Sequence, residues 1–271
     1  MISELALAIR EQKVILFVGA GISQNLGLPS FSELVEHLAQ ELGYDPEIFS
    51  THGDYLALTE YYKLEKGTIG PLRSWIDRTW NTGIDIRSSA IHKLIVDLEF
   101  PIIYTTNYDT WLEQAYDLHK KKFVKIVNVG DLTKVTPQVT QIIKFHGDPE
   151  DDSSIVLTES NYFSRLDFES PLDLKLRCDI LGKSVLFIGY SLSDINIRYM
   201  LYKLNQQWQR FSGYTDVRPK SFVFLTRPNP VQERVLCSRG IHAIVSDVDD
   251  PRKGLTDFLQ RLLHVSLGRD V

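Results

Sequence analysis

The chain has 271 residues, of which 43% are hydrophobic and 24% charged, a composition close to that of an ordinary soluble protein. Its formal net charge of −5 at pH 7 argues against a generally cationic nucleic-acid-binding protein. Its two cysteines, Cys178 and Cys237, provide neither a disulfide framework nor a four-cysteine zinc site. The charged first residues do not resemble a signal peptide, and no apolar run approaches the roughly 18 residues that span a bilayer, so we expect a cytoplasmic protein without a membrane segment.

Short apolar runs recur along the chain, and we predict that each contains a strand. Most are rich in Val, Ile and Phe, and near-continuous apolar runs of this length are typical of strands buried on both faces of a parallel sheet. In chain order they are KVILFVGA (13–20), FPIIYTTN (100–107), KFVKIVNV (122–129), QIIKFHG (141–147), SVLFIGYS (184–191), SFVFLT (221–226) and IHAIVS (241–246).

Helical patterns, with apolar residues at three- and four-residue spacing, separate many of these runs. This alternation of strands and helices predicts an α/β fold, with a Rossmann-like, open, mainly parallel, doubly wound sheet. The predicted helices cover residues 29–42, 108–119, 193–211 and 254–265.

The stretch from about residue 31 to residue 98 contains several helical patterns and no convincing strand. We therefore expect a helical insertion at 31–98 that packs as a lid or small subdomain. Because the chain has no low-complexity segment, internal repeat or long linker, we expect residues 1–271 to form a single domain. In open parallel sheets, ligands bind outside the carboxyl ends of the strands, so the residues that follow each strand are the candidates for a site.

The first predicted strand ends in the sequence GAGIS. Gly19 and Gly21 allow a tight turn and a close approach of the backbone to a ligand, and Ser23 follows near the expected start of a helix, whose free N–H groups suit a phosphate. The dinucleotide-binding fingerprint is only partial, because Gln24 stands where its third glycine would be and no acidic residue closes a second strand about 20 positions on. A tight turn without a ligand explains the motif equally well.

Polar clusters follow two more strands. In YTTNYD, four polar side chains follow one strand, at Thr105, Thr106, Asn107 and Asp109. Asn107 or Asp109 can cap the next helix, but capping does not account for the whole cluster. In the later GYSLSD, Gly189 and Ser191 are small residues that suit a close approach of the backbone. Ser193 or Asp194 can cap the long helix that follows.

The tripeptide HGD occurs twice, with its histidine at position 52 and at position 146. No strand pattern precedes His52, so a loop or capping role is expected there. His146 closes an apolar run at the same predicted edge as the other polar strand ends. A lone histidine is usually structural, but one that converges with three polar strand ends is a candidate for a catalytic or ribose-contacting group.

The motifs GAGIS, T-x-N-x-D, HG and G-x-S follow four strands in this order, and the chain from about residue 14 to residue 195 thereby resembles the sirtuin family of NAD-consuming proteins. The resemblance implies that the glycine turn holds the pyrophosphate, the asparagine the nicotinamide ribose and a water, and the aspartate the nicotinamide amide. It also implies that the histidine contacts the ribose and serves as general base. The implied catalytic residues are Asn107 and His146. The implied NAD-binding residues are Gly19, Ala20, Gly21, Ser23, Phe31, Thr105, Asp109, Gly189 and Ser191. For Phe31, a role in the apolar core is equally open.

The chain departs from the deacylating members of that family in two places. Those proteins carry a zinc module with two Cys-x-x-Cys pairs between the histidine and the G-x-S turn, whereas residues 148–188 of this chain hold a single cysteine. Those proteins also have Gly-Ile-Pro-Asp-Phe-Arg after the first glycine turn, whereas this chain has GLPSFS at 27–32, without the arginine. Together with GYSLSD and HGDPEDDSSIVLTESNYF, these departures resemble the zinc-less effectors of bacterial antiphage defence. That resemblance implies hydrolysis of NAD+ to nicotinamide and ADP-ribose, no zinc, and no cofactor beyond NAD+ as substrate.

The same resemblance implies that the activity is regulated. Many members of the subgroup carry a second sensor domain, for which we expect no room in this chain, so control is expected through a homo-oligomer or a separate partner. The partner that the resemblance implies is a HerA-type hexameric ATPase, and direct binding to nucleic acid is not indicated. Three other functions stay open: an NAD-dependent protein deacylase, a non-enzymatic NAD+ or ADP-ribose sensor, and a structural subunit of an ATPase complex.

Overall fold

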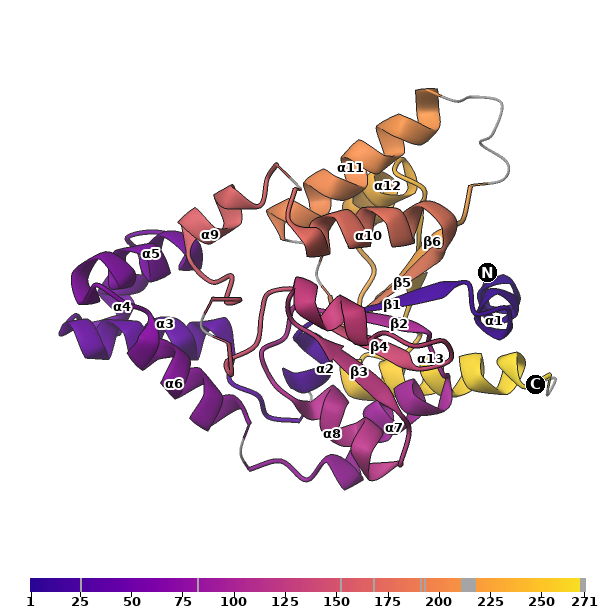
Figure 1. The fold of residues 1–271 in the computed structure, drawn as a ribbon, viewed down its shortest axis with the longest axis horizontal. Coiled ribbons are helices and arrows are strands. Elements are labelled where there is room, and N and C mark those ends of the chain that lie inside the picture. The colour runs from indigo at the N-terminus through magenta and orange to yellow at the C-terminus, as the bar shows by residue number, and fades with distance from the viewer. Residues whose placement is uncertain are drawn as a thin grey trace.

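Seven strands form one sheet in the order β3-β4-β2-β1-β5-β6-β7, and every pair of neighbours is parallel (Figure 1). Each predicted run contains one strand, so the predicted α/β fold with an open, doubly wound sheet is confirmed. The computed structural model describes residues 1–24, 26–81, 83–151, 153–167, 169–190, 192, 194–210 and 218–268. The strands are β1 (Val14–Val18), β2 (Ile102–Thr105), β3 (Phe123–Ile126), β4 (Thr140–Lys144), β5 (Ser184–Ile188), β6 (Ser221–Leu225) and β7 (Ile241–Val245).

Strand β1 lies at the centre of the sheet, where the direction of winding changes. Val18, its last residue, is level with Thr105 of β2 on one side and with Ile188 of β5 on the other. Strand β4 lies beyond β2, so the segments that follow β1, β2, β4 and β5 meet at one edge of the sheet. A reversal of strand order at the carboxyl edge opens a crevice that commonly holds ligands in such folds.

Helices cover both faces of the sheet, and side chains of β1 alternate between them. Val14, Leu16 and Val18 pack with the layer that contains α1, α7, α8 and α13, whereas Ile15 and Phe17 pack with α10, α11 and α12. None of the described helices is long and apolar enough to cross a membrane. The bounds are α1 (Ile2–Arg10), α2 (Gly21–Gln24), α7 (Ala90–Asp97), α8 (Trp111–Leu118), α9 (Glu159–Ser164), α10 (Pro171–Gly182), α11 (Ile195–Arg210), α12 (Pro230–Cys237), α13 (Pro251–Ser266) and the 3-10 helix η2 (Val129–Lys134).

The helical stretch between β1 and β2 has two parts. Four helices form a separate apolar cluster at one end of the molecule, away from both termini (Figure 1), whereas α7 packs on the sheet in the layer of α1 and α13. The first helix begins at Phe31 because Ser30 and Glu33 form a capping box, and it ends at Gly43 in the left-handed conformation. The four helices, here called the helical insert, are α3 (Phe31–Leu42), α4 (Pro46–Ser50), α5 (Tyr55–Lys66) and α6 (Gly70–Trp80), followed by the 3-10 helix η1 (Ile86–Ser88).

Hydrogen bonds attach the helical insert to the segment that follows β4. Thr59 Oγ1 of α5 donates to the carbonyl of Leu157 at 3.0 Å, and Arg73 Nη1 of α6 donates to the carbonyl of Pro149 at 3.2 Å. Tyr108 and Trp111, which follow β2, are buried in the same apolar cluster as the insert helices. The insert therefore lies against the carboxyl edge of the sheet, where the polar strand ends meet.

Candidate active site at the carboxyl edge of the sheet

Glycines bring the ends of β1 and β5 into direct contact. The N–H of Gly21 donates to the carbonyl of Gly189 at 2.8 Å, and a Cβ on Gly19 would lie 2.5 Å from that carbonyl oxygen. Gly189 itself has φ of +58°, a conformation that side chains disfavour. The glycines are thus needed for the close approach of two strand ends. The N–H of Gly21 is thus already bonded within the chain.

The amide of Asn107 is held in one orientation. Its Nδ2 donates to the carbonyl of Gly19 at 3.3 Å and to Ser23 Oγ at 3.1 Å, and its backbone N–H donates to Thr105 Oγ1 at 3.0 Å. A carbonyl can only accept, so the atom that faces Gly19 is the amide nitrogen. The amide oxygen, Oδ1, is buried without a hydrogen-bond partner in the described part of the chain. An acceptor is therefore available beside the crevice.

A buried polar layer lies behind Asn107. Ser23 Oγ donates to Asp109 Oδ2 at 2.9 Å, and the N–H of Trp111, the first residue of α8, donates to Asp109 Oδ1 at 3.2 Å. The N-cap residue of that helix is Thr110, so neither Asn107 nor Asp109 holds the cap position. Burial raises the pKa of Asp109 above its ordinary value, and Lys144, whose ammonium donates to the carbonyl of Asp109, offsets this only in part. This layer holds the asparagine from behind.

His146 is buried between a carboxylate and a phenol. Its Nε2 lies 3.2 Å from Asp194 Oδ2, and its Nδ1 lies 3.4 Å from the hydroxyl of Tyr162. The turn after the histidine requires Gly147, because φ there is +91° and a Cβ would lie 2.2 Å from the carbonyl oxygen of Ser154. Gly147 thus makes room for the chain's own backbone and directs the histidine toward the crevice.

Asp194 has a different partner for each carboxylate oxygen. Oδ1 accepts from the N–H of Asn196 at 2.8 Å and from the N–H of Ile197 at 3.1 Å, so it caps α11, while Oδ2 faces His146. Burial acts to raise the pKa of Asp194, but the histidine and the two N–H groups outweigh burial and hold that pKa below its ordinary value. The side chain is therefore a carboxylate near neutral pH.

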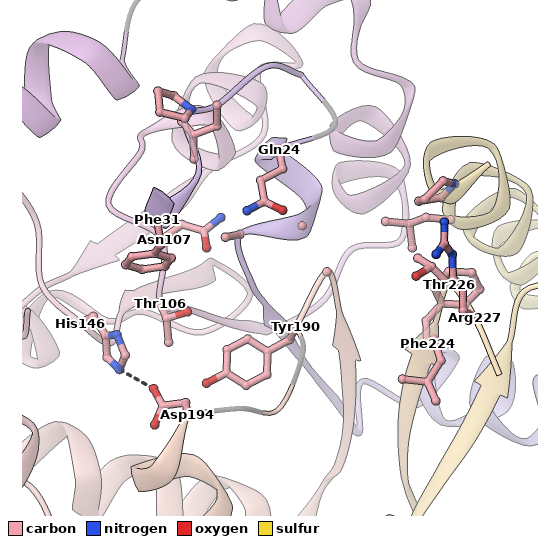
Figure 2. Close-up of a pocket in the computed structure, with 18 of the residues that line it drawn as sticks. Gln24, Phe31, Thr106, Asn107, His146, Tyr190, Asp194, Phe224, Thr226 and Arg227 are labelled. Atoms are coloured by element: carbon pink, nitrogen blue, oxygen red, sulfur yellow. Dashed lines mark ion pairs between the residues drawn. The ribbon is translucent and has the colours of Figure 1, made fainter. Parts of the chain in front are cut away.

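A cavity of about 740 Å³ extends from these residues along the edge of the sheet (Figure 2). At one end, His146, Asp194 and Asn107 lie near the ring of Phe31, whose centroid is 4.8 Å from that of Tyr55. Tyr190 lies between this end and the opposite one, where β6 ends. The opposite end is lined by Phe224, Thr226, Arg227, Asn229, Gln232 and Pro251, among others. Residues that follow β1, β2, β4, β5 and β6 therefore line one continuous cavity.

The structure places the predicted site residues in two groups. Six line the cavity: Ala20, Gly21, Phe31, Asn107, His146 and Gly189. Four lie behind its wall: Gly19 accepts from the side-chain amide of Asn107, Thr105 accepts from its backbone N–H, and Ser23 and Asp109 form the buried layer. Ser191 lies outside the described residues. His52, the histidine of the other HGD, is exposed in a turn after α4.

Several lining residues were not predicted as site residues. Asp194 was expected only as a possible helix cap, although its position five residues after Gly189 in GYSLSD was a usable signal. Tyr55 and Trp80 come from the helical insert, and no local pattern marks them, because only the packing of the insert brings them to the strand ends. Tyr162 of α9 lies within the stretch HGDPEDDSSIVLTESNYF, which contributed to the resemblance without a role for this residue. Arg227 likewise follows β6 without a motif.

Metal ligands do not gather in the described part of the chain, where no group of three or more His, Cys, Asp or Glu side chains is arranged to hold an ion. Cys178 lies on α10 and Cys237 on α12, and both are exposed free thiols.

Known proteins resemble this chain over the sheet and its edge. Residues 101–244 match the family model described as a SIR2-like domain. A protein of Enterococcus faecium named NAD(+) hydrolase ThsA is 33% identical over 205 residues, which cover 74% of this chain and 42% of that protein. A protein of the same name from Bacillus cereus (strain MSX-D12) is 30% identical over 212 residues, covering 77% and 43%. Defense-associated sirtuin 2 of Bacillus subtilis is 28% identical over 243 residues, covering 87% and 23%. The chain thus spans less than half the length of these curated relatives.

Proposed function

The chain belongs to the SIR2-like domain family, and on that premise we propose that it hydrolyses NAD+ to nicotinamide and ADP-ribose as an effector of bacterial antiphage defence. Relatives at about 30% identity are named NAD(+) hydrolases, and another is named a defense-associated sirtuin, which supports both halves of the proposal. The cytoplasm, where NAD+ is abundant, is the proposed place of action.

The observation that carries the proposal is the orientation of the Asn107 amide. Gly19 and Ser23 occupy its nitrogen, its oxygen is buried without a partner in the described part of the chain, and Asn107 lines the same cavity as His146. An unpartnered buried acceptor is unfavourable by about 1–3 kcal/mol unless a ligand satisfies it. A ribose hydroxyl or a water is a donor of the right kind. We propose that this oxygen holds the nicotinamide ribose and the attacking water.

The proposed reaction breaks the bond between C1′ of the ribose and the ring nitrogen of nicotinamide. The bonding electrons leave with the ring, which departs neutral, and the ribose passes through an oxocarbenium-like state. The oxygen of water then bonds to C1′, and its proton passes to His146. General base catalysis of this kind typically contributes about a hundred- to ten-thousandfold. The scheme uses no metal ion and no cofactor beyond NAD+ as substrate.

The shape of the cavity suits an extended dinucleotide. In this proposal the nicotinamide half lies among the rings of Phe31, Tyr55 and Trp80, which can exclude bulk water from the reacting carbon. The adenosine half lies toward the end of β6, near Thr226 and Arg227. The pyrophosphate then crosses the glycine contact between β1 and β5.

Regulation is part of the proposal, because unchecked hydrolysis of NAD+ would deplete the producing cell. We propose that a homo-oligomer and a HerA-type hexameric ATPase control the activity. Purified protein should then release nicotinamide slowly by itself and faster with the ATPase. Full activity of the isolated monomer that no partner changes would overturn this part alone.

The test is nicotinamide release from NAD+ by wild type, Asn107→Ala, His146→Ala and His52→Ala, with and without the ATPase. Both site substitutions should reduce release by at least about a hundredfold. His52→Ala is the matched control, since it removes an exposed histidine from the same tripeptide, and it should act as wild type.

Three results would contradict the proposal. Removal of an acyl group from a lysine peptide in the presence of NAD+ would indicate a deacylase. NAD+ binding without release, unchanged by His146→Ala, would indicate a sensor. Absence of both binding and release would indicate a structural subunit of an ATPase complex.

A further inference from the structure

Asp194 and His146 come together from distant parts of the sequence, at the start of α11 and after β4. The Nε2 of His146 lies 3.2 Å from Oδ2 of Asp194, and both side chains are buried at the end of the cavity that holds Asn107. The dashed line in Figure 2 joins them. A carboxylate at this distance does more than cap a helix, since capping uses only its other oxygen.

The position of the carboxylate decides which nitrogen of His146 carries a proton. The contact is an ion-pair distance and not a completed hydrogen bond, since Nε2 is buried without a hydrogen-bond partner in the described part of the chain. A carboxylate only accepts hydrogen bonds, so its charge favours a proton on the ring nitrogen nearest to it. That nitrogen is Nε2, which leaves Nδ1 with the free electron pair. The hydroxyl of Tyr162, 3.4 Å from Nδ1, is placed on the accepting side of the ring.

From this arrangement we infer that Asp194 is a positioning residue for His146, which holds the ring with Nε2–H toward the carboxylate and makes Nδ1 the nitrogen that accepts a proton. The inference rests on the proposed function for its effect on turnover. In the reaction, the attacking water takes the place of the Tyr162 hydroxyl at Nδ1 and gives that nitrogen a proton, and the resulting imidazolium carries both N–H groups. The negative charge of Asp194 then stabilises the positive charge of that ring.

Other ionisable groups pack around the pair. They are Tyr55 of α5, Tyr108 after β2, Tyr162 of α9, Tyr190 after β5, and Arg165, which is paired with Asp173. Burial raises the pKa of all four tyrosines above the ordinary value, so they stay neutral over the pH range of an assay. Arg165 keeps its charge and bonds Asp173 and the carbonyl of Phe145. A loss of turnover on removing the Asp194 charge is therefore assigned to the histidine.

The chain offers a substitution that removes the charge and keeps the helix cap. Asparagine caps helices about as well as aspartate. Asp194→Asn should therefore leave α11 folded while depriving His146 of its anionic partner. Asp45→Asn is the matched control, because Asp45 caps α4 by accepting from the N–H of Ile48 at 3.1 Å and does not line the cavity.

The first measurement is the pH dependence of kcat and KM for nicotinamide release under the condition that activates wild type. In Asp194→Asn, kcat should fall by about ten- to a hundredfold while KM changes little, since the loss is in proton transfer. Asp45→Asn should match wild type. An unchanged kcat and profile in folded Asp194→Asn would overturn the inference.

The second measurement needs no turnover. Nitrogen-15 NMR of the imidazole should show the proton of neutral His146 on Nε2 in the wild type. Asp194→Asn and Asp194→Ser, which both keep a side chain that can cap α11, should lose this preference for Nε2. If NAD+ is not hydrolysed but the tautomer behaves in this way, the proposed function fails and the positioning role stands. A wild-type ring with its proton on Nδ1 would overturn the inference whatever the activity.

Discussion

At the scale of the residue, the candidate site depends on hydrogen bonds that lie behind the cavity wall. Asn107 presents an oxygen to the cavity because Gly19 and Ser23 take its nitrogen, and Ser23 is in turn bonded to Asp109. In a buried network of this kind, each hydroxyl or amide is held in one orientation by its hydrogen bonds, so the loss of one group affects its neighbours. Ser23 therefore affects the site by orienting Asn107, although Ser23 does not line the cavity.

Ser23→Ala should lower both stability and turnover. The change removes a donor to Asp109 and an acceptor for Asn107, and a buried group left without its partner is unfavourable by about 1–3 kcal/mol. Chemical denaturation should show that loss, and nicotinamide release should fall in protein that is still folded. Ser164→Ala is the control, because that exposed hydroxyl donates only to the carbonyl of Asn161, and about 0.5 kcal/mol or less is expected there. Equal effects of the two substitutions would contradict this account of Ser23.

At the scale of the element, the turns after the strands decide where the side chains point. Strand β4 ends at Lys144, and the chain then doubles back, with the N–H of Val156 donating to the carbonyl of His146 at 2.9 Å. The left-handed Gly147 makes this turn possible. Without it, the histidine two residues past the strand would not be turned toward Asp194.

Three glycine-to-alanine substitutions distinguish the effect of backbone conformation on stability from the effect of a steric clash. Gly182→Ala, at the exposed last position of α10 with nothing within 4 Å, should stabilise by up to about 1 kcal/mol. Gly67→Ala has free space but φ of +71°, and should destabilise by about 1 kcal/mol. Gly147→Ala adds a backbone clash at 2.2 Å and should destabilise by more than about 2 kcal/mol. Denaturation of the three variants should show this order. A Gly147→Ala protein as stable as Gly67→Ala would contradict the argument.

At the scale of the whole molecule, the cavity lies where the helical insert meets the sheet. The insert has an apolar cluster of its own, and Tyr108 and Trp111 from the sheet edge belong to it, so the two parts share buried surface. The chain returns from the insert through α7, where His92 is buried beside Trp111, with ring centroids 6.5 Å apart, and its Nδ1 lies 2.7 Å from Ser89 Oγ. Folding thus keeps a histidine in an apolar layer.

This histidine should make global stability depend on pH. Burial lowers the pKa of His92 from 6.5 to about 4, so between these values the unfolded chain binds a proton that the folded chain does not. The free energy of unfolding is therefore highest above pH 6.5 and falls as the pH drops toward 4, by at most roughly 3 kcal/mol from this group. Denaturation of wild type and His92→Gln between pH 7 and pH 4 tests this. The variant should lose less stability on acidification, and parallel curves would contradict the assignment.

The sequence by itself was sufficient for the sheet. All seven strands were predicted because strands buried on both faces must be continuously apolar, and that requirement is visible in the chain without knowledge of the partners. Helices were predicted where apolar residues recur at three- and four-residue spacing, as at residues 29–42 and along α11. In contrast, α10 and α12 were missed, because their apolar residues do not form one clear stripe and some, such as Leu174 and Val231, are exposed.

For the site, the sequence determined which strand ends carry polar groups and, by resemblance, that Asn107 and His146 are the candidates for catalysis. Only the tertiary structure decided what each side chain does beside its neighbours. It placed Ser23 and Asp109 behind the wall, paired His146 with Asp194 across 48 positions of sequence, and brought Tyr55 and Trp80 over the cavity. The physical reason is that strand ends are set by local apolar pattern, whereas hydrogen-bond partners and cavity walls come from segments that meet only when the insert packs against the sheet.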